Sequence, residues 1–173
     1  MNAEEQLPEH WLRGPVIDIP DLLQPAAHAL LQSVDEIKKY TIDFPEELLH
    51  KKPAGRASVA FHLKHITGVL DRMLTYASAA SLSEAQFDYL KNETKASEED
   101  RIPLLINSFE EKVEQALEIF KITNPAVLTE KREVGRKKLP STVLGLYFHA
   151  AEHSQRHVGQ LLVTVSVLHE RNQ

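Results

Sequence analysis

Hydrophobic residues recur at steps of three and four along four long segments, the spacing of one face of an α-helix. The clearest stripe lies in residues 57–80, where successive apolar positions are Val59, Leu63, Ile66, Leu70, Met73 and Ala77. The same spacing predicts long helices over residues 19–41, 96–121 and 141–169. Four long helices imply an all-α fold, a four-helix bundle.

Proline and capping residues indicate where two of these helices begin. Ser97 with Asp100 resembles an N-cap pair at the start of the third long helix, and Pro103 fits only near that start. Ser141, which follows Pro140, is the expected N-cap of the fourth. These positions give the predicted helix starts.

The remaining segments are predicted to form connections between the helices and an N-terminal arm. Residues 81–94 are expected to hold a short helix, and residues 122–140 form a loop with a small hairpin around Gly135. Prolines interrupt residues 1–20, which we expect to form an irregular N-terminal arm. The length favours a single domain over residues 1–173.

Composition narrows the classes of function. A formal net charge of −5 argues against a general nucleic-acid binder, which normally has a dominant basic face. No apolar run approaches membrane-spanning length and the first residues do not resemble a signal segment, so a cytoplasmic location without membrane contact is expected. The chain has no cysteine, which excludes disulfides, thiolate ligands and a cysteine nucleophile. A metal site must therefore use His, Asp, Glu or water.

Histidines cluster in the predicted fourth helix, where His149, His153 and His157 follow one another at four-residue intervals. Two histidines four apart can bind one ion from adjacent turns of a helix. His153 and His157 flank the apolar stripe, where a cleft between helices would leave a coordination position open. His149 lies further round the helix and is expected to be exposed or to contact a ligand rather than the ion.

A third ligand would come from the second helix, which offers His62 and His65. Periodicity places His62 closer to the buried stripe and His65 at its edge, and it does not decide between them. The alternative is a metal-free bundle, because histidines on helices are usually surface or hydrogen-bonded residues and a four-residue pair also arises by chance.

Taken together, these two stretches resemble the DinB-like superfamily, also described as the metal-dependent thiol S-transferase superfamily. The second-helix pattern falls on Ser58, Val59, Leu63, His65, Ile66 and Arg72. The signature of two histidines followed by Gly-Gln falls on His153, His157, Gly159 and Gln160. Two positions depart from the pattern: Ala57 stands where a Trp is usual, and Val158 where an Arg is common.

The resemblance implies an up-down-down-up four-helix bundle, often dimeric, and a divalent ion, most often zinc or nickel. It implies His65, His153 and His157 as the metal ligands. His62, His149 and Gln160 then become possible groups around those ligands, while no catalytic residue is indicated. A homodimer is expected.

The leading functional hypothesis is a metal-dependent transferase acting on a low-molecular-weight thiol. A thiol in the open coordination position would lose its proton and become a strong nucleophile. The same ion could activate water, which would make the protein a metal-dependent hydrolase. A non-catalytic bundle that an ion stabilises is the third alternative. Glu152, next to the ligands, is expected to be a solvated surface carboxylate.

Overall fold

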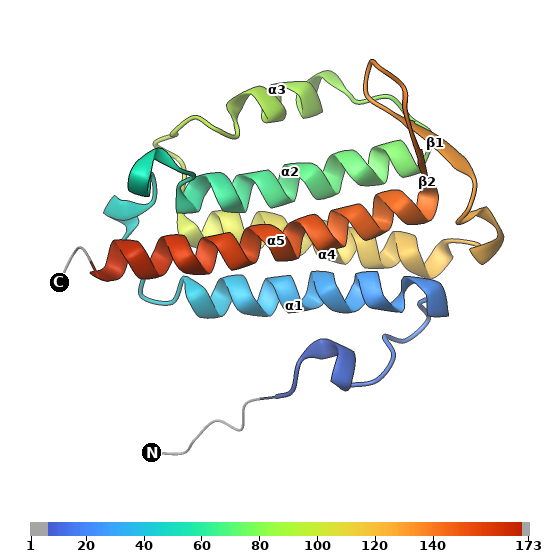
Figure 1. The fold of residues 1–173 in the computed structure, drawn as a ribbon, viewed down its shortest axis with the longest axis horizontal. Helices are drawn as coiled ribbons and strands as arrows, with labels where there is room; N and C mark the ends of the chain where they lie inside the picture. Colours follow the sequence, from blue (N-terminus) through green and yellow to red (C-terminus); the bar gives the residue numbers. More distant parts are fainter. Residues whose placement is uncertain (1–6, 171–173) are drawn as a thin grey trace.

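The computed structural model describes residues 7–170 and has the predicted all-α fold. The four long helices are α1 (Gln24–Tyr40), α2 (Val59–Ala77), α4 (Ile102–Ile122) and α5 (Val143–Glu170). A shorter helix, α3 (Glu84–Asn92), lies outside the bundle along α2 (Figure 1). Single 3₁₀ turns occur at His10–Leu12, Asp21–Leu23, Glu46–Leu48, Pro53–Gly55 and Pro125–Val127.

The long helices pack around one hydrophobic core. Helix α5 packs between α1 and α2, and α4 contacts α1 and α2 from the other side. In Figure 1, α1 and α5 run in one direction along the bundle, whereas α2 and α4 run in the other. Each helix contributes fully buried side chains to the centre: Leu30, Leu63, Phe109 and Leu161 are at most 1% exposed. Burying such a side chain stabilises the fold by about 1.5–3 kcal/mol.

The predicted start of the third long helix was wrong. Helix α4 begins at Ile102, after an N-cap residue, Arg101, that makes no side-chain capping bond. The Asp100 carboxylate instead accepts hydrogen bonds from Ser97 N and from Lys64 Nζ. The first amide of α4, Ile102 N, donates to the carboxylate of Glu46 at 3.0 Å. The cap is thus supplied by a residue distant in sequence. The negative charge of Glu46 at the N-terminus of α4 also complements the helix dipole.

The N-cap of α5 was also mispredicted, by one residue. Ser141 lies in strand β2 (Leu139–Thr142), which pairs antiparallel with β1 (Lys131–Val134). The residue that caps α5 is Thr142, whose Oγ1 accepts a hydrogen bond from Gly145 N at 3.0 Å. The hairpin itself was predicted, and its turn contains Gly135 at φ +68°, a conformation that favours glycine.

The short helix α3 is also where the sequence predicted one. Its N-cap Ser83 accepts a hydrogen bond from Gln86 N, and the Gln86 side chain accepts one from Ser83 N. This reciprocal pair is a capping box, which satisfies two amides that would otherwise lack a partner. Helix α3 therefore has a well-defined start although it lies outside the bundle.

The irregular arm lies against α1 over the part that is described. His10 N donates to Gln32 Oε1, and His10 Nε2 lies 2.8 Å from Asp35 Oδ2. Residues 1–6 of the predicted arm, and 171–173 of the predicted domain, lie outside the described residues. None of the helices within residues 7–170 is long and apolar enough to cross a membrane.

Gly68 allows α3 to approach α2 closely. A Cβ added at this position would lie 2.7 Å from Arg72 Nη1 and 2.8 Å from the ring of Tyr89. Tyr89 is fixed on α2 by a 3.0 Å hydrogen bond from its hydroxyl to the carbonyl of Lys64. The absence of a side chain at Gly68 therefore sets the distance between these two helices.

Replacing Gly68 with Ala is expected to lower the melting temperature measured by circular dichroism. The clash costs about 1–3 kcal/mol, more than the gain of up to about 1 kcal/mol in helix propensity. Gly159→Ala is the matched control, because a Cβ there meets nothing within 4 Å. A Gly68→Ala protein as stable as the control would show that α3 does not need this close contact.

Candidate metal centre

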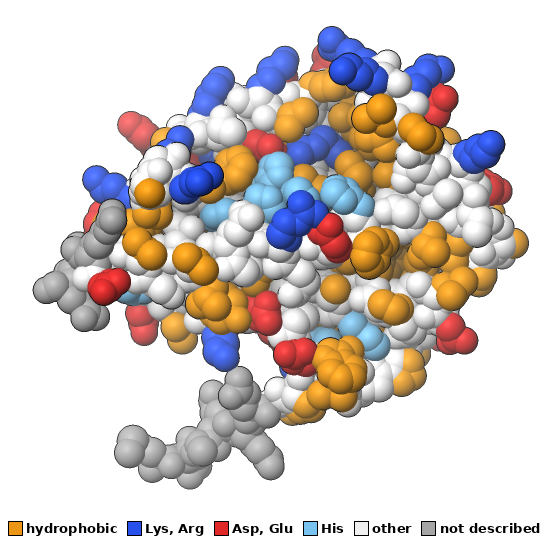
Figure 2. All heavy atoms as spheres, in the orientation of Figure 1, with side chains coloured by type: hydrophobic (Ala, Val, Ile, Leu, Met, Phe, Trp, Pro, Cys, Tyr) orange, Lys and Arg blue, Asp and Glu red, His pale blue; other side chains and the backbone are white. Residues whose placement is uncertain are grey.

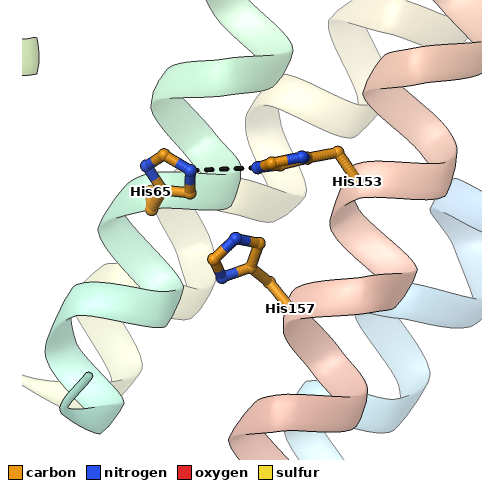
Figure 3. A group of neighbouring side chains, drawn as sticks. All are labelled: His65, His153 and His157. Carbon is orange, nitrogen blue, oxygen red and sulfur yellow. Dashed lines mark hydrogen bonds between the residues drawn. The ribbon is translucent and has the colours of Figure 1, made fainter. Parts of the chain in front are cut away.

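Three histidines from two helices converge on one face of the bundle. His65 lies on α2, and His153 and His157 lie on adjacent turns of α5 (Figure 3). One ring nitrogen from each of the three lies within 4.8 Å of the other two. His65 Nε2 and His153 Nε2 are 3.0 Å apart. The structure thus brings together the three histidines that the family resemblance indicated as ligands.

The spacing of these nitrogens suits a divalent ion. With metal–nitrogen bonds of about 2.0–2.1 Å, two ligand nitrogens of a tetrahedral zinc site are about 3.4 Å apart. His65 Nε2 and His153 Nε2, at 3.0 Å, are close to that spacing, and the His157 nitrogen lies within 4.8 Å of both, so small side-chain rotations would complete the geometry. His153 Nδ1 is also buried without a hydrogen-bond partner among the described residues. An ion bound through Nε2, the nitrogen 3.0 Å from His65, would leave this second nitrogen to carry the ring proton.

The surroundings of His153 and His157 favour neutral imidazoles. Burial, together with the neighbouring His157 and His65, lowers the pKa of His153 to about 4. Burial likewise lowers the pKa of His157 to about 4, with His65 adding to the effect. A neutral imidazole keeps one nitrogen lone pair, so both side chains are ready to bind a cation near neutral pH.

Glu93 fixes the orientation of His65. Its Oε1 lies 2.7 Å from His65 Nδ1, and its Oε2 accepts a hydrogen bond from Arg72 Nη1 at 3.3 Å. The Glu93 side chain is only 5% exposed, so this contact is shielded from water. A histidine that donates one ring N–H to a carboxylate presents its other nitrogen to a metal in a fixed direction. Here that other nitrogen is His65 Nε2, which faces His153.

Sequence reasoning missed Glu93. It is the residue that ends α3, a helix outside the bundle, and no spacing or periodicity relates it to the histidines. The available signal was Arg72, which belongs to the family pattern and lies on the same face of α2 as His65, two turns further on. A buried arginine on that face requires an acidic partner from another segment.

His62 lies beside the group of three rather than within it. It is 2% exposed, and its Nδ1 is 3.0 Å from His157 Nδ1. Burial, together with His157 and His65, lowers the pKa of His62 to about 4. Since this contact uses His157 Nδ1, His157 Nε2 is the nitrogen left for an ion. His62 thus contacts a candidate ligand, as expected of a residue around the site. That His65, His153 and His157 are the metal ligands stays a prediction.

The other residues predicted around the site lie further out. His149 is exposed, with its ring centroid 5.1 Å from that of His153. Gln160 is exposed on α5 and lines a cavity next to His62, and within the described residues it forms no hydrogen bond to the three histidines. The Glu152 carboxylate pairs with Arg156 at the surface. Figure 2 shows a group of histidine side chains at the surface of the molecule, next to basic and acidic side chains.

Fold and site together define a helical-bundle protein with a three-histidine group that could bind a divalent metal. The chain belongs to the DinB superfamily, whose sequence model matches residues 23–161. This confirms the family resemblance seen in the two histidine stretches, and the DinB-like helical fold with it. None of the curated proteins compared with the chain matches it.

Proposed function

We propose that this protein is a metal-dependent transferase acting on a low-molecular-weight thiol. The observation that carries the proposal is the meeting of His65, His153 and His157, with nitrogens within 4.8 Å of one another, at the surface of a DinB-superfamily bundle. Three protein ligands leave a coordination position for a substrate, which distinguishes catalytic from closed structural sites. Zinc or nickel, a homodimer and a cytoplasmic location belong to the same proposal.

The chain's own residues would prepare the site in three ways. Neutral His153 and His157 leave the full charge of the ion available to a substrate, since no anionic ligand offsets it. Glu93 holds His65 in one orientation. The ring of Phe61 stacks on His65 at 5.0 Å between centroids and covers one face of the imidazole. A divalent ion held here would supply the Lewis acidity that lowers the pKa of a bound thiol.

The proposed reaction balances without a redox partner. The thiol proton is lost to solvent, and the sulfur lone pair forms a new bond to an electrophilic carbon. A leaving group departs from that carbon with the electron pair of the bond that breaks. The residues of the site bind and orient the thiol, and no side chain needs to form a covalent intermediate.

Turnover tests the proposal directly. The zinc- or nickel-loaded protein is mixed with glutathione or cysteine and a panel of electrophiles that includes 1-chloro-2,4-dinitrobenzene, and product is followed by absorbance. We expect metal-dependent, thiol-dependent turnover. A protein that gains thermal stability on metal binding but shows no thiol-dependent turnover across the panel would be a non-catalytic, metal-stabilised bundle. Metal-dependent ester hydrolysis without thiol would instead indicate a hydrolase.

A further inference from the structure

A cavity of about 650 Å³ opens beside the candidate metal centre. It lies between the segment that precedes α2 and the middle of α5, and its wall includes His62, Gly159 and Gln160. His62 connects the cavity to the centre, because its Nδ1 lies 3.0 Å from that of His157. None of the three candidate ligands lines the cavity itself, which is separated from His157 by the single side chain of His62.

The charge of the cavity is opposite to that of the chain. Arg56 and Arg156 both line it, and none of its lining residues is acidic, although the chain as a whole carries a net charge of −5. The guanidinium of Arg156 is already paired with Glu152. Arg56 takes part in none of the ion pairs found within residues 7–170, so its charge is available to a ligand. The cavity is therefore suited to an anion.

The volume of the cavity and its remaining side chains indicate which kind of anion it would bind. A cavity of this volume accommodates an organic molecule rather than a bare inorganic ion. Ala57 and Val163 provide apolar wall, and the amide of Gln160 provides hydrogen-bonding groups. The planar guanidinium of arginine binds a carboxylate through two parallel hydrogen bonds. An organic thiol that also carries a carboxylate matches all of these features.

We propose that this cavity binds the carboxylate-bearing part of the thiol substrate, with Arg56 as the principal carboxylate-binding residue. The inference rests on the proposed function, because it places the thiol sulfur at the ion. It adds the class of the thiol: one that carries a carboxylate several bonds away from its sulfur. Arg56 then determines specificity, and the three histidines provide the chemistry.

The test measures thiol binding to the cobalt(II)-loaded protein through the sulfur-to-cobalt charge-transfer absorption. Glutathione is compared with its diethyl ester, which has the same thiol and no free carboxylate. We expect the wild-type protein to bind glutathione at least about tenfold more tightly than the ester, since hydrogen bonds between charged groups are stronger than those between neutral groups. Arg56→Gln should remove this preference and leave the affinity for the ester unchanged.

Two further variants control for net charge and for the location of the ligand. Arg136→Gln removes one positive charge from the hairpin turn, which does not line this cavity, and should leave both affinities unchanged. Gly159→Leu fills the cavity from α5, where a Cβ meets nothing within 4 Å. It should weaken binding of both glutathione and the ester by tenfold or more and leave 2-mercaptoethanol unaffected.

The outcomes separate the two proposals. Equal affinities for acid and ester, together with an Arg56→Gln variant that changes neither, would overturn the carboxylate site while leaving thiol chemistry at the ion in place. Unchanged glutathione binding in Gly159→Leu would equally overturn it. If cobalt binds at the histidines but no thiol produces the charge-transfer absorption, the proposed function fails, and the inference fails with it.

Discussion

Replacing His153 and His157 together with alanine is expected to abolish metal binding. The wild-type protein should hold about one divalent ion per chain, because a nitrogen from each of three imidazoles lies within 4.8 Å of the other two. The double variant keeps only His65, and a single imidazole does not retain an ion through dialysis. Elemental analysis of the dialysed proteins measures the metal content, and far-UV circular dichroism establishes that the variant is folded.

His149→Ala is the matched control for this experiment. It removes a histidine from the same helix, four residues before His153, but an exposed one outside the group of three. Its metal content should equal that of the wild type. A double variant that retains the wild-type metal content would show that the ion lies elsewhere, and the site described here would be wrong.

Glu93→Gln is expected to weaken metal binding by about 10–100-fold, the usual effect of removing a partner that orients a ligand. The change keeps the size of the side chain but removes the charge that faces His65 Nδ1 and Arg72 Nη1. His65 then loses its strongest acceptor, and the buried Arg72 loses its counter-ion. Competition with a chromophoric chelator measures the affinity of wild type and variant for zinc.

The control for Glu93 is Glu152→Gln. Glu152 precedes the ligand His153 in the sequence, yet it pairs with the exposed Arg156 and contacts solvent. Its replacement should change zinc affinity less than about twofold, because exposed ion pairs contribute little. Equal affinities in Glu93→Gln and wild type would rule out the role of Glu93. A loss in Glu152→Gln as large as that in Glu93→Gln would point to net charge as the cause.

The parts of the fold that could be predicted from the sequence are those that depend on residues close together in the chain. The apolar stripe from Val59 to Ala77 predicted α2 within a few residues, because a long amphipathic pattern has one inward face. The start of α4 could not be predicted in this way. Its first amide is bound by Glu46, a residue 56 positions earlier, so the cap depends on the tertiary structure.

The site residues likewise fall into two groups: those that local spacing predicts and those whose position depends on the tertiary structure. His153 and His157 followed from their four-residue spacing on one helix, which places them on adjacent turns. Periodicity alone left His62 and His65 undecided, and the family resemblance favoured His65. The structure shows why the pattern was ambiguous: both lie within 3.0 Å of a histidine of α5, His65 next to His153 and His62 next to His157. Arg72 indicated that an acidic partner was needed, but it did not identify Glu93, whose position depends on the path of the chain after α3.

The central claim is that His65, His153 and His157 bind one divalent ion. The most direct test is a crystal of the protein grown without added metal, with anomalous scattering recorded at the zinc and nickel absorption edges. We predict one ion about 2.0–2.1 Å from a nitrogen of each of these three histidines, with His62 outside bonding distance and a remaining position open to solvent. An ion bound by His62 in place of His65, or three rings that point apart with only protein atoms between them, would contradict it.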